Sequence, residues 1–218
     1  MAQVFRPWTN GVTRLVLGGS LAAIIAVVIV WIALPRSTWD TLIGRAVAQA
    51  VPFSHQHHVA GLGLDCRYCH TGVEESSFAG IPPTEICMTC HSQIWTEAEI
   101  LEPVRQSFLT GERLVWNRVH NLPDFVFFNH AIHVNNGVPC VECHGRVDTM
   151  PLTWRAESLH MQWCLGCHRD PSHRLRPREA VTAMEWVPAE PRDQLAARLM
   201  EEYDIHPETL TDCYVCHR

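Results

Sequence analysis

The pattern of hydrophobic and polar positions separates an apolar N-terminal stretch from a long, mainly polar remainder. Between Val12 and Leu34, Arg14 is the only charged residue. The twenty residues from Leu15 to Leu34 would form a helix of about 30 Å at about 1.5 Å per residue, which matches the hydrocarbon core of a bilayer. A buried helix of a soluble domain rarely contains so long an apolar run. The pattern therefore predicts a transmembrane anchor within residues 1–36.

Charges and aromatic residues at the ends of this run predict its orientation. Arg6 and Arg14 lie on its N-terminal side, which predicts a cytoplasmic N-terminus and places the remainder outside a bacterial cytoplasmic (inner) membrane, in the periplasm. Trp8 and Trp31 lie near the two interfaces. Residues 48–50 (Ala-Gln-Ala) resemble a signal-peptide cleavage site, but they follow the apolar run at a distance, and the run is longer than a usual signal sequence. We therefore expect a single-pass, uncleaved anchor.

Pro35 is expected to end the span, and residues 37–52 then read as a juxtamembrane amphipathic helix or linker. Its apolar face would consist of Trp39, Leu42, Ile43, Ala46, Val47 and Ala50. This face would lie on the lipid surface or pack against a neighbouring membrane subunit.

Three segments further along the chain carry weaker patterns. Residues 97–127 begin as a charged helical stretch, broken at Pro103, and continue as an extended apolar run. The Arg- and Pro-rich residues 169–191 indicate a linker that lies over a partner, or else a bare loop. Residues 192–204 predict an amphipathic helix.

The charge of the chain makes nucleic acid an unexpected partner. The 218 residues carry a formal net charge of −6, and all seventeen basic residues are arginines. Nucleic-acid binding depends on a surplus of basic residues, which this chain lacks.

All ten cysteines belong to one pentapeptide pattern, C-x-x-C-H, which occurs five times. This pattern is the attachment signature of c-type haem, in which two thiols bind the porphyrin vinyl groups and the adjoining imidazole binds the iron. A disulfide framework or zinc sites would also use paired cysteines, but neither requires a histidine after every second cysteine. The cysteines are Cys66, Cys69, Cys87, Cys90, Cys140, Cys143, Cys164, Cys167, Cys213 and Cys216, and the proximal iron ligands would be His70, His91, His144, His168 and His217.

Five covalently bound haems would leave few residues for an ordinary apolar core. We therefore expect residues 53–218 to form a mostly irregular, α-helical multihaem cytochrome c domain, with short helices around the haems and long loops between them.

A second pattern, F-x-H-x-x-H, precedes the first and third motifs and divides this domain into two modules, at about 53–91 and 128–168, with a fifth haem at 213–217. Histidines three positions apart lie on one face of a helical turn and can reach two different irons. The pattern predicts four distal ligands, His55, His58, His130 and His133.

The fifth distal ligand is open between three residues. His120, upstream of the second module, is the first choice, and Met161 or Met150 would give a thioether ligand and a higher potential. Both methionines are equally suited to packing against a porphyrin. We expect the remaining histidines, His57, His160, His173 and His206, to lie on the surface or around the ligands.

Together with the anchor and the two modules, three short sequences give the chain a resemblance to a known family. These are Arg118-Val119-His120, Phe128-Asn129-His130 and Met161-Gln162-Trp163-Cys164. The chain resembles the pentahaem cytochrome c subunit of bacterial alternative complex III, and its modules are similar to class III, or c7-type, cytochromes. Residues 169–212 carry little of the resemblance.

The resemblance implies a place in a quinol-oxidising respiratory or photosynthetic membrane complex, which passes electrons to a periplasmic acceptor. The implied partners are an iron-sulfur protein, a polytopic quinol-binding subunit and a monohaem cytochrome c. The quinol site would belong to the polytopic subunit.

Because the plausible distal ligands are at least as numerous as the irons, we expect an electron-transfer subunit without catalytic residues rather than an enzyme. One alternative is a multihaem nitrite or hydroxylamine enzyme, which needs a vacant distal position, often marked by a lysine in the attachment motif; this chain contains no lysine. Another is a membrane-anchored quinol dehydrogenase of the NapC and NrfH type, whose haem motifs usually lack the F-x-H-x-x-H pattern.

Overall fold

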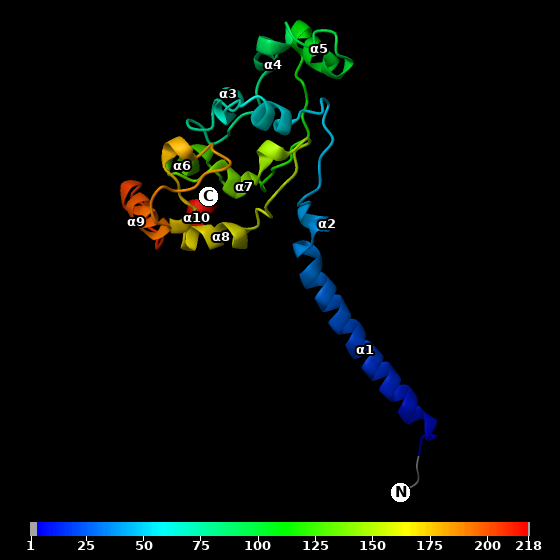
Figure 1. Ribbon diagram of the computed structural model, residues 1–218. Coiled ribbons are helices and arrows are strands. Elements are labelled where there is room, and N and C mark those ends of the chain that lie inside the picture. Colours follow the sequence, from blue (N-terminus) through cyan, green and yellow to red (C-terminus); the bar gives the residue numbers. More distant parts are fainter. Residues whose placement is uncertain (1–3, 218) are drawn as a thin grey trace. The chain divides into compact units, whose positions relative to one another are not determined.

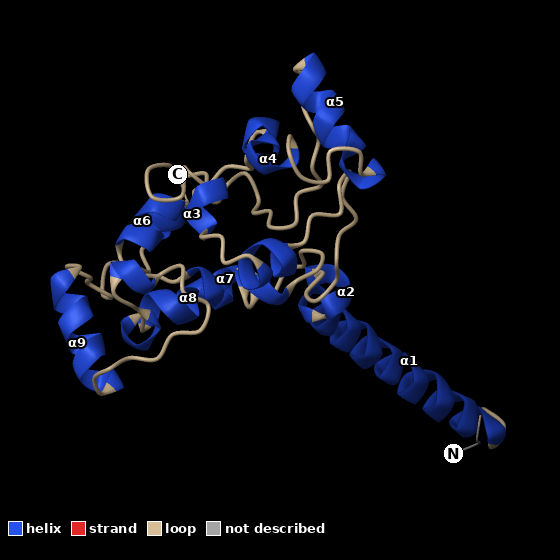
Figure 2. Cartoon of the chain, turned by 45° about the horizontal axis from the view of Figure 1, so that its top comes forward, coloured by secondary structure: helices blue, strands red, loops and turns tan. Residues whose placement is uncertain are grey.

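The computed structural model describes residues 4–217, which belong to two compact units, residues 1–43 and residues 44–218. Short helices joined by irregular segments make up these described residues, and no β-strand occurs among them (Figure 2). This confirms the predicted fold class, a helical and irregular chain with one N-terminal apolar helix.

The first unit is dominated by α1, Trp8–Ala33, a continuous helix without a buried residue (Figure 1). With the short turns that follow it, the helical stretch Trp8–Thr41 contains an 18-residue window with a mean hydropathy of 2.7, so it is long and apolar enough to cross a membrane. Pro35 lies in a 3-10 turn, η1 (Leu34–Arg36), directly after α1. The Arg36 guanidinium donates a hydrogen bond of 2.7 Å to the carbonyl of Ile32, which satisfies one carbonyl at the end of the helix.

The helix predicted over residues 37–52 is limited to one turn, α2 (Thr38–Thr41). Leu42 adopts a left-handed conformation with φ of 57°, and Gly44 follows with φ of 72°, so helical hydrogen bonding cannot continue. Within the second unit, Gly44 N–H donates to the carbonyl of Arg155 at 2.9 Å, and Ala46 forms an isolated antiparallel bridge with Trp154. Of the two alternatives for residues 37–52, the amphipathic helix was therefore wrong beyond Thr41, because hydrogen bonds to residues 153–155 take backbone groups of this segment.

Every attachment motif in the second unit lies on a short helix. These helices are α3 (Cys66–Cys69), α4 (Thr84–His91), α7 (Cys140–His144), α8 (Met161–Arg169) and α10 (Cys213–Cys216) (Figure 1). The two F-x-H-x-x-H patterns also lead into helices, a π-helix η2 (Gln56–Gly61) and α6 (His130–Asn135). The unit also contains four 3-10 turns, η3 (Glu99–Leu101), η4 (Val147–Thr149), η5 (Ser172–Arg174) and η6 (Arg178–Ala180).

The charged helical stretch in residues 97–127 is α5, Glu102–Thr110, which packs against α4. We had predicted that Pro103 breaks this helix, and that prediction was wrong. Pro103 lies in the first turn, where the missing N–H would have no helical partner. Gly111, with φ of 72°, ends the helix.

The predicted helix at residues 192–204 is confirmed as α9, Arg192–Glu202. Its buried face, Leu195 and Leu199, packs with Tyr203 and with Leu175 from the Arg- and Pro-rich segment. Leu175 is 1% exposed. The interpretation of residues 169–191 as a linker over a partner was therefore wrong for this part, which packs within its own chain.

The two modules interlock through their F-x-H-x-x-H segments. Gln56 N–H, in the first module, donates to the carbonyl of Met150 at 3.1 Å, in the loop after the third motif. Correspondingly, Ala131 N–H donates at 3.1 Å to the carbonyl of Ser76, in the loop after the first motif. Each module therefore supplies backbone partners for the ligand-bearing helix of the other.

Candidate haem-attachment and iron-ligand sites

The attachment cysteines lie on single helical turns that present two thiols at a time. Asp65 caps α3 by accepting a hydrogen bond of 2.9 Å from Arg67 N–H, and Pro83 and Pro139 precede α4 and α7. None of the ten cysteines is fully buried, and none forms a disulfide. Among the described residues, no three His, Cys, Asp or Glu side chains form a cluster that could hold a metal ion by themselves.

Hydrogen bonds fix the ring orientation of four of the five predicted proximal histidines. In each, Nδ1 pairs with a backbone carbonyl: His70 with Gly80 at 2.7 Å, His91 with Ile94 at 3.3 Å, His168 with Leu210 at 2.8 Å and His217 with Phe125 at 2.9 Å. A carbonyl only accepts, so Nδ1 carries the proton and Nε2 keeps its lone pair. This is the arrangement that metal-ligating histidines normally show.

Three of the four distal histidines predicted from the F-x-H-x-x-H pattern show the same arrangement. Nδ1 donates to the carbonyl of Ser54 from His58 at 2.9 Å, to that of Ser77 from His130 at 3.1 Å and to that of Asn129 from His133 at 2.7 Å. His55 Nδ1 lies 3.0 Å from the hydroxyl of Thr153.

Two histidines that we did not predict as ligands differ in this respect. His206 Nε2 lies 2.9 Å from a carboxylate oxygen of Asp204, and His173 Nε2 lies 3.7 Å from Asp193. The Nε2 of His206 is hydrogen-bonded to a carboxylate, and that of His173 faces one beyond hydrogen-bond distance, which distinguishes both from the predicted ligands.

The phenylalanine of each F-x-H-x-x-H pattern packs against both of its histidines. Phe53 stacks on His58 with ring centres 4.3 Å apart and meets His55 edge-on at 4.9 Å. Phe128 repeats this geometry with His133, at 4.6 Å, and with His130, at 4.7 Å. The phenylalanine therefore fixes the planes of two imidazoles that diverge from one helical turn.

Three pairs of histidine rings have the spacing expected across one iron. A ring nitrogen binds such a metal at about 2 Å, so two rings on opposite sides of an iron have centres about 6 Å apart. The observed distances between ring centres are 6.3 Å for His58 and His91, 6.0 Å for His133 and His168, and 6.4 Å for His130 and His144. Each pair joins a predicted distal ligand to a predicted proximal ligand.

A central group of histidines surrounds His144. Burial and then the charge of His70 lower the pKa of His55 to about 4, and burial with the charge of Arg155 lowers that of His120 to about 4. Burial and then the charge of His120 lower the pKa of His144 to about 3. These imidazoles are therefore neutral near pH 7, which is the form that binds a metal.

The structure places the three candidates for the fifth distal ligand in different surroundings. His120 lies in the central group, 4.3 Å from the ring centre of His144, and its Nε2 is buried without a hydrogen-bond partner. Met150 is 2% exposed, whereas Met161 is 66% exposed and lies one turn before Cys164 on α8. The unpaired Nε2 of His120 is the kind of buried polar atom that a metal would satisfy.

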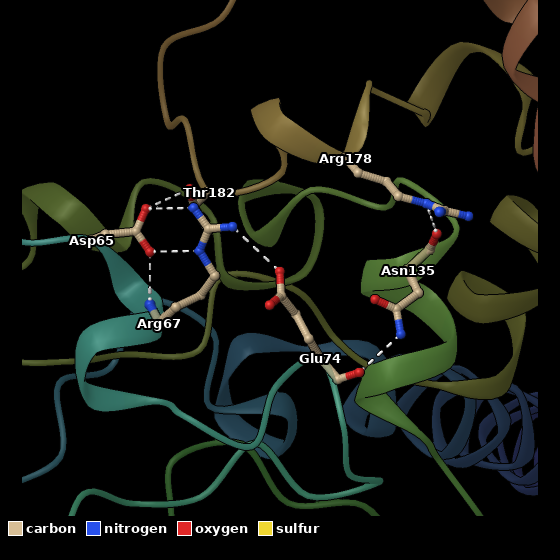
Figure 3. Close-up of polar contacts among 6 residues, drawn as sticks. All are labelled: Asp65, Arg67, Glu74, Asn135, Arg178 and Thr182. Carbon is tan, nitrogen blue, oxygen red and sulfur yellow. Dashed lines mark hydrogen bonds and ion pairs between the residues drawn. The ribbon is translucent and has the colours of Figure 1, made fainter.

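A polar network, not foreseen from the sequence, ties the first motif to distant segments (Figure 3). Arg67 donates two side-chain hydrogen bonds to Asp65, at 2.9 and 3.1 Å, and one to Glu74 at 3.3 Å, while the Thr182 hydroxyl donates to Asp65 at 2.9 Å. Hydrogen bonding to Arg67 lowers the pKa of Asp65 to about 2. Asn135 of α6 donates to the Glu74 carbonyl at 2.9 Å and accepts from Arg178 at 2.6 Å. The network therefore joins both modules to residues 178–182.

Comparison with known proteins gives one informative similarity. No family model matches the chain. Over 122 residues, 56% of this chain and 55% of the other, the chain is 34% identical to the "menaquinone reductase, multiheme cytochrome c subunit" of Nitratidesulfovibrio vulgaris. The chain thus spans about half the length of this curated relative. The similarity supports a multihaem cytochrome c with covalently bound c-type haems, in keeping with the site geometry.

Proposed function

We propose that this protein is a membrane-anchored pentahaem c-type cytochrome that relays electrons within a quinol-oxidising complex similar to alternative complex III. The observation that carries this proposal is the set of three His-His pairs, each 6.0–6.4 Å apart and each joining an attachment motif to an F-x-H-x-x-H segment. The relative's printed name associates it with a quinone-linked complex. When bound, haem supplies reversible one-electron chemistry at iron.

The chain's own residues hold each iron from two sides in this proposal. Three ligand pairs follow the ring distances: His58 with His91, His130 with His144, and His133 with His168. The internal repeat then assigns His55 to His70, whose charge acts on His55. The carbonyl groups that accept from Nδ1 orient these rings and make Nε2 a better donor to iron.

For the distal ligand of the fifth motif, the candidates are His120, Met161 and Met150. His120 lies 4.3 Å from His144, too close for two rings on opposite sides of one iron, and it neighbours motif 3 rather than motif 5. Met161 lies one turn before Cys164, whose pKa is raised by burial and then by the charge of Cys216 in the fifth motif. Met161 is therefore the better-placed candidate for the fifth motif, and the buried Met150 the weaker one.

Because each iron would be held on both sides, no coordination position remains for a substrate. The protein therefore conducts electrons and converts no substrate. The helix α1 would cross the membrane once with its N-terminus in the cytoplasm, and the haem domain would lie in the periplasm. Its partners would be an iron-sulfur protein, a polytopic quinol-binding subunit and a monohaem cytochrome c.

A quinol dehydrogenase of the NapC and NrfH type is the second candidate, because the quinone-linked name of the relative fits it as well. The two functions differ in which subunit oxidises quinol. Purified protein that a quinol analogue reduces without other subunits would support the second candidate. Reduction that requires the intact complex would support the proposed relay.

The haem content is tested by mass spectrometry of the denatured, purified chain, combined with a haem stain after denaturing electrophoresis. We expect a mass increment equal to five haems that survives denaturation, since the ten cysteines form five pairs. A chain without covalent haem would overturn the proposal.

A further inference from the structure

The five attachment motifs, numbered 1 to 5 in chain order, are not all beside their neighbours in sequence. Motifs 1 and 2 are in contact. The hydroxyl of Tyr68 in motif 1 lies 2.9 Å from that of Thr89 in motif 2.

Motif 1 also lies beside motif 3. Asp65, directly before Cys66, accepts a hydrogen bond of 2.9 Å from the Thr182 hydroxyl, and Cys140 N–H donates to the neighbouring carbonyl of Val181 at 3.0 Å, so Cys66 and Cys140 begin their motifs beside the same two residues. These are the first cysteines of the two modules, so the modules meet at equivalent positions of the internal repeat.

Motif 3 lies beside motif 4. Arg174, in the turn η5 that follows α8, donates a hydrogen bond of 3.2 Å to Glu142 in motif 3. Helix α6 lies between these motifs, since His130 faces His144 at 6.4 Å and His133 faces His168 at 6.0 Å.

Motif 4 lies beside motif 5. His168 Nδ1 donates to the carbonyl of Leu210 at 2.8 Å, shortly before Cys213. Among residues 4–217, no hydrogen bond joins motif 2 directly to motif 3, 4 or 5.

We infer that the five motifs, and the haems they would hold, form an unbranched series in the order 2-1-3-4-5, with motifs 2 and 5 at its ends. Solvent exposure supports this order independently. Cys90 of motif 2 and Cys213 of motif 5 are the two exposed cysteines of the ten. An electron donor and an electron acceptor would therefore meet the series at motif 2 and motif 5, rather than at the first and last motifs in sequence. This inference rests on the proposed function, because it concerns haems.

Iron positions in the haem-loaded full chain test the order directly. They are measured by electron cryomicroscopy or by anomalous diffraction at the iron edge, with each iron assigned through its thioether bonds. We expect the nearest neighbours to be 2 and 1, 1 and 3, 3 and 4, and 4 and 5. An iron of motif 1 at one end, or an iron of motif 2 next to motif 3, would overturn the order while leaving the proposed relay intact. A chain without thioether-bound haem would overturn both.

Two matched variants test the order in solution. His58→Met and His133→Met should each introduce a methionine ligand and raise the potential of one haem, in motif 2 and motif 4 respectively. In an electron paramagnetic resonance titration, reduction of the altered haem removes its magnetic interaction with its neighbours. We expect the resonance signal of one neighbouring haem to change in His58→Met, and the signals of two neighbouring haems to change in His133→Met. Two perturbed neighbours for His58→Met would contradict the inference.

Discussion

The hydrogen bonds of individual histidines decide which ring nitrogen is available to a metal. Seven of the predicted ligands donate Nδ1 to a backbone carbonyl, whereas His206 and His173 present Nε2 to carboxylates. The sequence motifs predicted which histidines would be ligands. They could not predict the partners, because Gly80, Phe125 and Leu210 reach the rings only through the folded chain.

Adjacent histidines in the first module provide a sharp test of ligand assignment. In His58→Met, one of the five irons should acquire a methionine ligand, a near-infrared band in the ferric state and a higher potential. His57→Met, at the exposed neighbouring position, should leave the spectrum and the potentials unchanged. A near-infrared band in His57→Met, or none in His58→Met, would show that the assignment is wrong.

Asp65 gives the protein a stability component that depends on pH. Its folded pKa of about 2 lies below the ordinary value of 3.8, so the charged form stabilises the fold above about pH 4, and this contribution is lost as pH falls towards about 2. Asp65→Asn should lower the denaturation midpoint at pH 7 and flatten its dependence between these pH values.

Denaturant titrations followed by the haem absorption at pH 7, 4 and 2.5 measure this effect. Asp124→Asn, at an exposed position, serves as the control and should follow the unmodified protein. Equal pH profiles for the two variants would contradict a role for Asp65 in holding motif 1.

At the scale of elements, local chemistry explains which predictions succeeded. The motif helices and α1 could be predicted because cysteine spacing and an apolar run act within one segment. The helix expected over residues 37–52 failed at Leu42, where a left-handed residue and pairing with residues 153–155 prevail over an amphipathic pattern. The burial of Leu175 depends on α9, which lies later in the chain, so the linker pattern could not reveal it.

Helix α9 is expected to contribute much of the stability of the second unit outside the haem sites. Leu199 is 0% exposed, so Leu199→Ala should lower the free energy of unfolding by about 2–5 kcal/mol. Leu109→Ala on α5, where the side chain is 74% exposed, should change it by less than about 0.5 kcal/mol. Denaturant unfolding measures both, and equal effects would refute the packing described for α9.

The insertion of α1 into a membrane is expected to depend on its uninterrupted apolar sequence. Ile25→Arg places a charge in the middle of the span at a cost of about 2.5–3.5 kcal/mol, so it should reduce insertion, and Ile25→Leu should not. Alkaline extraction of membranes, followed by haem staining of the soluble and membrane fractions, separates the two results. Full retention of Ile25→Arg in the membrane would argue against α1 as the anchor.

At the scale of the whole chain, the two units serve different purposes. The first unit contains no predicted ligand, and the second unit contains every predicted ligand. Within that unit, the interlocked modules bring the ligands of motifs 1 and 3 into one central group, and the network of Asp65, Arg67 and Glu74 joins both modules to residues 178–182 (Figure 3). Partial removal of one module should therefore disturb the ligands of the other.

The central claim is that the chain holds every iron from both sides and leaves no position for a substrate. Electron paramagnetic resonance of the fully oxidised, haem-loaded protein at low temperature, repeated with nitrite, measures this most directly. We expect low-spin signals alone, unchanged by nitrite, and no carbon monoxide adduct after reduction. A high-spin signal from a five-coordinate iron that shifts on adding nitrite would contradict the account and indicate a reactive site.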